Sequence, residues 1–172
     1  MTLVEFNEAA RKTAVTEFNA CLGCLSWAEK MADARPFESI IEVLAEGRAQ
    51  WQSATEAQIL EAFTAHPQIG DLDALRNKYA NTANAEQGQI TAADEGTLIA
   101  LQGDNQAYLA RFGFIFIVCA TGKSATEMLE LLQARLLNDR ATEVANAAHE
   151  QWLITELRLK LLIGTLYTGN VS

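Results

Sequence analysis

The chain has 172 residues, enough for one domain with a sizeable apolar core. Its 22 acidic residues against 13 basic residues give a formal net charge of −9, which argues against binding to nucleic acid or to an anionic membrane surface. Apolar residues make up 49% of the chain, which excludes wholesale disorder.

Good helix formers dominate the sequence, and apolar residues recur at helical spacing through most of it. The pairs Ser53 with Glu56 and Ser124 with Glu127 have the spacing of capping boxes, and Asp71 and Asp139 are further candidate N-caps. The predicted helices span about residues 4–21, 22–34, 37–52, 54–64, 71–79, 81–102, 105–111, 124–137 and 139–166.

The stretch at about 113–120 is the exception to this pattern. It is largely aromatic and β-branched, which favours an extended conformation. Its backbone N–H and C=O groups must find partners, although the sequence offers no obvious second strand. We therefore predict an all-α fold: a single-domain helical bundle over residues 1–172, with one buried extended segment that lines a pocket.

His66 is the first candidate for chemistry. Pro67 pushes the preceding residue out of the helical region, so the helix before it ends near Ala65 and the imidazole is held at a rigid corner. A helix C-terminus favours a protonated ring, and histidine is the usual general acid or base near neutral pH. The alternative is a C-capping histidine without chemistry. His149 lies inside the last predicted helix, where an exposed position without a role is expected.

Two other polar groups stand out. Glu86 and Gln87 together offer acceptors and a donor pair that suit an amide or urea edge, but a solvated helix start is the favoured interpretation from the residues alone. Arg158 shares a predicted helix face with Ile154 and Leu161. Its guanidinium therefore either extends from an apolar face to solvent or clamps a carboxylate in a cleft.

Cys21 and Cys24 have the spacing of a redox motif but lack the βαβ context of a thioredoxin-like fold. Two small buried residues on a helix are the favoured interpretation. Three cysteines, and an N-terminus without a basic segment followed by an apolar stretch, lead us to expect a cytoplasmic protein. The longest apolar run, 112–120, is too short to span a membrane.

Several short motifs occur in a fixed order, and together they resemble one family. The motifs are His66-Pro67-Gln68-Ile69-Gly70-Asp71, Glu86-Gln87-Gly88, the stretch from Phe114 to Ser124, Arg135-Leu136-Leu137-Asn138-Asp139 and Leu157-Arg158-Leu159. The set resembles the 2-oxo-4-hydroxy-4-carboxy-5-ureidoimidazoline (OHCU) decarboxylase family. Trp27-Ala28 and Ala34-Arg35-Pro36-Phe37 resemble its bacterial branch. Each motif alone is weak, but their order and spacing over nearly the whole chain are specific.

The resemblance implies an all-helical carboxy-lyase without a cofactor, which converts OHCU to (S)-allantoin and CO2 in urate catabolism, and a homodimer. The family's catalytic roles fall on His66, Glu86 and Arg158. Its substrate-binding positions fall on Pro67, Ala83, Asn84 and Gln87, and on the backbone of Ile117, Val118, Cys119 and Ala120.

One position departs from the family pattern. Many members carry a serine three residues before the glutamate, where this chain has Ala83. Asn84 either replaces that hydrogen bond to substrate, or the contact is missing. Two other classes of function remain open on the sequence: a redox protein working through Cys21 and Cys24, and a helical interaction module without catalysis.

Overall fold

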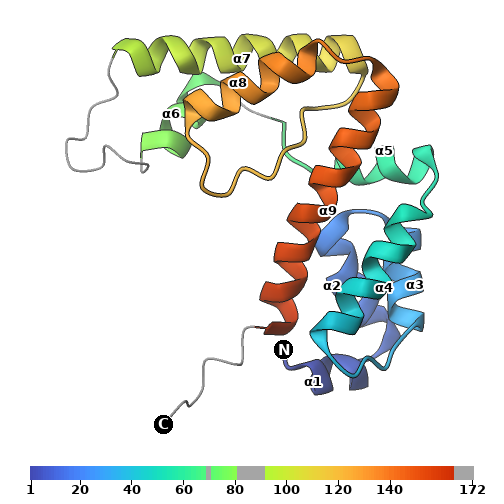
Figure 1. The fold of residues 1–172 in the computed structure, drawn as a ribbon. Coiled ribbons are helices and arrows are strands. Elements are labelled where there is room, and N and C mark those ends of the chain that lie inside the picture. The colour runs from blue at the N-terminus through green and yellow to red at the C-terminus, as the bar shows by residue number, and fades with distance from the viewer. Residues whose placement is uncertain (69–70, 81–91, 165–172) are drawn as a thin grey trace. The chain divides into compact units, whose positions relative to one another are not determined.

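The computed structural model describes residues 1–68, 71–80 and 92–164 (Figure 1). Within these ranges the regular secondary structure is helical and contains no strand, which confirms the predicted all-α class. The helices are α1 (Leu3–Glu8), α2 (Arg11–Leu22), α3 (Leu25–Asp33), α4 (Ile40–Gln52), α5 (Glu56–Thr64), α6 (Leu72–Ala80), α7 (Ala92–Phe112), α8 (Ala125–Leu136) and α9 (Arg140–Gly164).

The internal contacts divide the chain into two compact units. Unit 1 comprises Met1–Ala65 with Ala148–Ser172, and unit 2 comprises His66–Ala147. Helix α9 begins in unit 2 and ends in unit 1. The prediction of one domain over residues 1–172 stays a prediction. None of the described helices has the length and hydropathy that a membrane-spanning helix requires.

Aromatic side chains fill the core of unit 1. Phe18 packs edge-on against Phe6 and Trp27, with ring centroids 4.8 and 5.8 Å apart, and all three side chains are buried. Trp27 donates its indole N–H to the carbonyl of Gly47 at 3.0 Å. A Cβ at Gly47 would lie 3.0 Å from the Trp152 ring, so glycine lets α4 approach both tryptophans.

The predicted first helix, 4–21, is wrong because the chain breaks it into α1 and α2. Ala9 is extended, with φ −62° and ψ 147°. The guanidinium of Arg35 donates to the carbonyls of Phe6 at 2.7 Å and Ala9 at 2.8 Å. These carbonyls would otherwise lack partners at a helix end. Arg35, which lies 26 positions from Ala9, therefore supplies the hydrogen bonds that the carbonyls at this break would otherwise lack.

A second correction concerns the start of α5. Thr55, rather than Ser53, is the N-cap, and it forms a capping box with Gln58 rather than Glu56. Ser53 instead ends α4, and its hydroxyl donates to the carbonyl of Gln50 at 2.9 Å. The capping box of Ser124 with Glu127 at the start of α8 is confirmed.

Unit 2 contains α6, α7, α8 and the first two turns of α9. We predicted a break near residues 102–105, and this prediction is wrong because α7 is one helix of 21 residues. Asn105 lies within it and donates its side-chain N–H to the carbonyl of Leu101 at 2.8 Å. Asp71 and Asp139 accept from the backbone N–H groups of Ala74 and Thr142, which confirms both as N-caps.

Candidate active site

His66 is the first residue of unit 2 and follows the C-cap of α5. The helix ends at Thr64, so the predicted stop just before the His66-Pro67 pair is confirmed. The imidazole is half-buried and Pro67 is exposed. The second histidine, His149, is exposed on α9, as predicted. Of the two, His66 therefore has the more sheltered side chain and the fixed corner that acid–base chemistry favours.

Four predicted site residues lie outside the described residues: Ala83, Asn84, Glu86 and Gln87. Their roles stay predictions.

Arg158 lies on the part of α9 that belongs to unit 1. Its guanidinium is half-buried and donates from Nη1 to the carbonyl of Cys21, at 3.2 Å. The hydroxyl of Thr155 lies 3.4 Å from this carbonyl oxygen and donates to the carbonyl of Gln151 at 2.8 Å, and Thr155 is fully buried. The carbonyl of Cys21 lies in the last turn of α2, where acceptors are unused by the helix and carry partial negative charge.

The predicted apolar face around Arg158 is wrong. Leu161 is 66% exposed and Ile154 is half-buried, whereas the buried face of α9 carries Thr155 and Leu159. Arg158 therefore lies at the border between the buried and exposed faces, with one guanidinium nitrogen held by backbone. The role of Arg158 stays a prediction.

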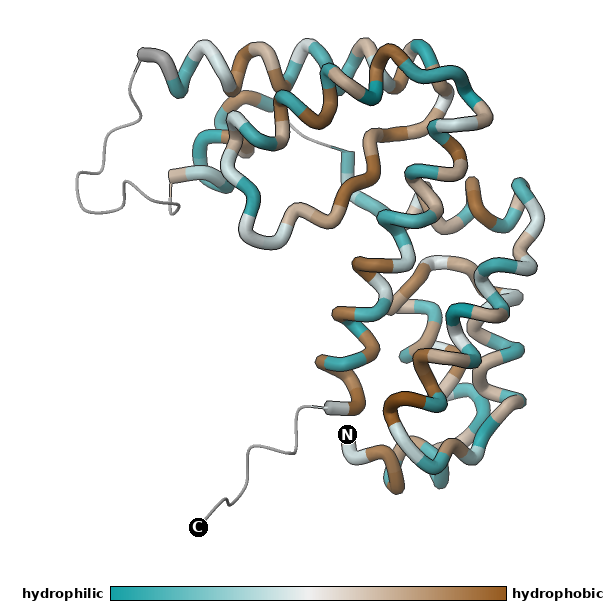
Figure 2. Tube along the Cα trace, in the orientation of Figure 1, coloured by the Kyte–Doolittle hydropathy of each residue, from teal (hydrophilic) through white to brown (hydrophobic). Residues whose placement is uncertain are grey.

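Residues 113–120 connect α7 to α8 without helix or strand, as predicted, and Figure 2 shows this connection as a hydrophobic run. Phe114, Phe116 and Ile117 are buried, whereas Val118, Cys119 and Ala120 are half-buried. We name residues 113–120 the extended segment. Its membership of a substrate pocket stays a prediction.

Backbone carbonyls of the extended segment have partners in unit 2. The carbonyl of Ile117 accepts from Arg135 Nη1 at 2.5 Å, and the carbonyl of Cys119 accepts from Lys123 Nζ at 2.8 Å. The carbonyl of Ala120 accepts from the backbone N–H of Lys123 at 3.0 Å. Side chains and a turn thus replace the second strand that the sequence lacks.

Arg135, Glu143 and Tyr108 form a buried polar cluster that the sequence analysis did not predict. Arg135 Nε lies 2.7 Å from Glu143 Oε1, and the Tyr108 hydroxyl donates to the same oxygen at 2.5 Å. Glu143 is fully buried and Arg135 is 9% exposed. A sequence signal existed, since Arg135 opens one of the motifs that carry the family resemblance.

Two groups of the cluster, Tyr108 and Glu143, have shifted pKa values. Burial raises the pKa of Tyr108, and its hydrogen bond to Glu143 raises it further. Burial also acts to raise the pKa of Glu143, but hydrogen bonds from Tyr108, Asn138, Asn146 and Arg135 outweigh burial and lower that pKa. The structure therefore favours a neutral phenol beside an ionised carboxylate paired with a guanidinium.

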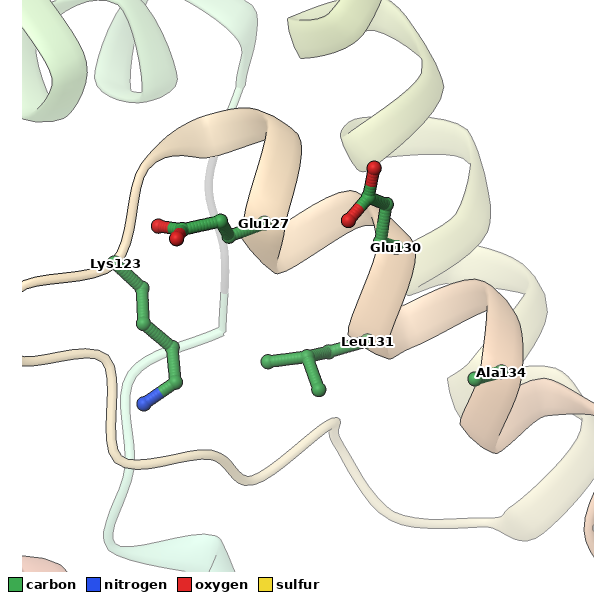
Figure 3. A pocket seen from close by; sticks show the side chains of 5 residues that line it. All are labelled: Lys123, Glu127, Glu130, Leu131 and Ala134. Atoms are coloured by element: carbon green, nitrogen blue, oxygen red, sulfur yellow. The ribbon is translucent and has the colours of Figure 1, made fainter.

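An open pocket of about 370 Å³ lies along α8 (Figure 3). It is lined by Lys123, Glu127, Glu130, Leu131 and Ala134, and contains none of the predicted site residues. Its residues have local roles: Glu127 closes the capping box of α8, and Lys123 holds the carbonyl of Cys119. No catalytic group is assigned to it.

Cys21 and Cys24 are buried, as predicted, but they do not share one helix. Cys21 lies in the last turn of α2, and Cys24 is the N-cap of α3. Gly23 between them has φ +86°, and a Cβ there would lie 2.4 Å from the Cβ of Ala65. The glycine is thus required by backbone geometry and close packing. Burial raises the pKa of the Cys21 thiol to about 11, which disfavours the reactive thiolate.

Comparison with known proteins places this chain in one family. A family model described as OHCU decarboxylase matches residues 7–160. The uric acid degradation bifunctional protein TTL of Arabidopsis thaliana is 35% identical over 150 residues, which are 85% of this chain. They are 46% of that protein, so the chain spans about half its length.

Two further matches agree. A 2-oxo-4-hydroxy-4-carboxy-5-ureidoimidazoline decarboxylase of Haloferax volcanii is 25% identical over 162 residues, which cover 92% of this chain and 94% of that protein. A crystal structure of an OHCU decarboxylase in the presence of (S)-allantoin is 36% identical, with a TM-score of 0.71. That match covers 86% of this chain and 97% of the solved chain. The sequence resemblance is thereby confirmed: this chain belongs to the OHCU decarboxylase family.

Proposed function

We propose that this protein converts OHCU to (S)-allantoin and CO2 in urate degradation, with His66, Glu86 and Arg158 as its catalytic residues and without a cofactor. The observation that carries the proposal is the family match over residues 7–160, supported by similarity to an OHCU decarboxylase solved in the presence of (S)-allantoin. The half-buried imidazole of His66 and the backbone-held guanidinium of Arg158 support two of the three roles.

In the proposed reaction the bond between the ring carbon and the carboxylate breaks, CO2 leaves, and the electron pair stays on that carbon, delocalised into the ring. One proton must then be added to a single face. His66 is the proposed proton shuttle: it accepts a proton from the region of the 4-hydroxyl and later delivers one to carbon. A histidine at a proline-fixed corner suits this role, because proton transfer requires a group held in one place.

Glu86 and Arg158 are proposed to orient the substrate. The Glu86 carboxylate accepts hydrogen bonds from ring or ureido N–H groups. Arg158 has five N–H donors in a planar fork, and its hydrogen bond to the carbonyl of Cys21 restricts how that fork turns. It holds an acceptor group of the substrate, either the leaving carboxylate or a carbonyl. Binding that is equally strong in the ground state and in the transition state would lower KM without raising kcat.

The remaining contacts are proposed from the family positions. Pro67 and the carboxamide of Gln87 border the substrate, and the backbone of Ile117 to Ala120 contributes further contacts. Asn84 is proposed to supply the hydrogen bond that a serine makes in many members, because Ala83 has no polar side chain.

A homodimer in the cytoplasm is proposed as the working state. The three cysteines, an odd number and all free in the structure, support the compartment. Sedimentation of the purified protein at several concentrations tests the dimer, which predicts twice the mass of one chain.

The two histidines give a matched test of the chemistry. We expect His66→Ala to lower kcat for OHCU by about a hundredfold or more, the usual contribution of general acid–base catalysis, and to lose enantiomeric selectivity. His149→Ala removes the exposed histidine and should keep wild-type kinetics. Far-ultraviolet circular dichroism checks that both variants fold. Wild-type turnover by His66→Ala would overturn its role.

The cofactor-free proposal has its own test. Activity should survive exhaustive chelation and dialysis. Activity that is lost on chelation and restored by an added metal ion would contradict it.

A further inference from the structure

The buried polar cluster of Arg135, Glu143 and Tyr108 also contacts the extended segment. The same guanidinium that pairs with Glu143 donates through Nη1 to the carbonyl of Ile117, in the middle of the extended segment. Its carbon lies 4.6 Å from the centroid of the Phe116 ring. Arg135 therefore contacts two consecutive residues of the segment, one through its backbone and one through its side chain.

The ion pair alone does not explain why these charges are buried. Taking two charges out of water costs free energy that their attraction only partly returns, so an apolar pair of similar volume is often as stable. Glu143 needs more than Arg135 to be satisfied: Asn138 and Asn146 each donate to Oε2 at 2.9 Å. A guanidinium does offer what an apolar side chain lacks, which is several N–H donors in a fixed plane.

Because the peptide bond is planar, the hydrogen bond to the carbonyl of Ile117 also sets the direction of the next backbone N–H. In a trans peptide the carbonyl oxygen and the N–H of the next residue point to opposite sides. A carbonyl of Ile117 fixed on Arg135 therefore directs the N–H of Val118 away from the cluster. Lys123 acts on the carbonyl of Cys119 in the same way and directs the N–H of Ala120. Two donors two residues apart are thus oriented by side chains from outside the extended segment.

We infer that Arg135 is a positioning residue for the decarboxylation: it fixes the extended segment so that the N–H of Val118 faces the substrate. This inference rests on the proposed function, in which the backbone of residues 117–120 contacts OHCU. Glu143 and Tyr108 hold the guanidinium in the plane that this contact requires. Arg135 itself touches no reacting atom.

Arg135→Lys is the decisive variant, because lysine keeps the charge beside Glu143 but has one compact ammonium in place of a planar fork. We expect KM for OHCU to rise about tenfold with kcat changed by less than about threefold, the pattern of lost ground-state binding. Amide hydrogen exchange over residues 113–120 should become faster relative to exchange in α7. Tyr108→Phe keeps the ring and removes only the hydroxyl, and should raise KM by about threefold.

Two control variants separate positioning from general damage. Arg111→Lys changes an arginine of the same unit that donates to the carbonyl of Asn138 and, among the described residues, forms no hydrogen bond with the extended segment. Leu132→Ala removes a fully buried side chain of α8 and lowers stability without altering a hydrogen bond. Both variants should keep the wild-type KM. The ratio of the amide exchange rates in the extended segment to those in α7 should also stay at the wild-type value.

The outcomes distinguish this inference from the proposed function. Wild-type protein that does not accelerate OHCU decay overturns the proposed function, and the substrate role of Arg135 with it. Active wild-type protein whose Arg135→Lys and Tyr108→Phe variants keep the wild-type KM overturns this inference alone. So does a KM that rises equally in Leu132→Ala. If Arg135→Lys fails to fold, Tyr108→Phe against Leu132→Ala decides by the same criteria.

Discussion

Different kinds of contact stabilise the interiors of the two units. Unit 1 packs helices through aromatic edges, as where Phe18 meets Phe6 and Trp27, and its core is mostly apolar. Unit 2 has aromatic packing as well, but it also buries the charged pair of Arg135 and Glu143. It is unit 2 that contains the extended segment.

The difference shows what a non-helical stretch costs in a helical protein. A helix bonds most of its own backbone, so unit 1 needs side-chain partners mainly at helix ends, as where Arg35 holds the carbonyls of Phe6 and Ala9. The extended segment has no second strand among the described residues, and side chains must therefore supply its partners. An arginine buried at a carbonyl is one such partner, and a buried carboxylate must then neutralise it.

The largest effect on stability is expected at the centre of unit 2. Glu143→Gln leaves the guanidinium of Arg135 buried without its counter-charge, which should lower the free energy of unfolding by about 3 kcal/mol at neutral pH. Urea titrations of wild type and variant measure it. A loss no greater than that of an exposed substitution would contradict the importance of the ion pair.

The effect of Glu143→Gln on the free energy of unfolding should depend on pH. The pKa of Glu143 is lower in the folded protein than its ordinary value of 4.5, so the folded state binds this proton less readily than the unfolded chain. The carboxylate therefore stabilises the fold fully above the unfolded-state pKa, and this contribution is lost as pH falls through the lowered folded pKa. Glutamine does not titrate. The difference in unfolding free energy between wild type and Glu143→Gln should thus narrow below about pH 4.5.

Arg158 tests whether the apolar unit 1 also contributes to chemistry. Arg158→Ala should lower kcat/KM for OHCU by about a hundredfold, the cost expected for a lost charged hydrogen bond to substrate. Lys160→Ala is the matched control, because Lys160 lies two residues away, is exposed and pairs with Glu156. Equal kinetics in the two variants would remove Arg158 from the proposed site.

Helix caps in the two units allow a smaller comparison. Thr55→Ala in unit 1 and Ser124→Ala in unit 2 each remove a capping box, and each should cost about 1 kcal/mol of stability. Ser124 follows the extended segment closely. If Arg135 rather than the cap positions that segment, thermal melts of both variants should shift while KM for OHCU stays at the wild-type value.

The smallest effect is expected at the cysteines of unit 1. Because burial raises the pKa of Cys21 to about 11, iodoacetamide at pH 8 should label the half-buried Cys119 well before Cys21. Cys24→Ala should change the decarboxylase kcat/KM by less than about twofold. Activity abolished by this substitution in a folded protein would favour the redox alternative.

Local patterns predicted most of the fold because local contacts determine it. The capping box at Ser124 and the N-caps at Asp71 and Asp139 involve residues three apart, and the structure confirms them. The extended segment was predicted from β-branched and aromatic composition.

The misplaced cap of α5 and the false break in α7 were local errors, but two other features were missed because distant residues decide them. Neighbouring sequence does not show that Arg35 holds the carbonyls at the end of α1, so the break near Ala9 was missed. The buried cluster joins Tyr108 to Glu143 across 35 positions, and no local pattern marks such a pair. For the site, the corner at His66 was predicted from proline geometry alone, whereas the catalytic roles came from the family resemblance.

The most direct test of the account is to generate OHCU from urate and follow its decay with and without this protein by circular dichroism. The account predicts faster decay and accumulation of the single (S) enantiomer of allantoin. Decay at the uncatalysed rate, with racemic allantoin as the product, would contradict it.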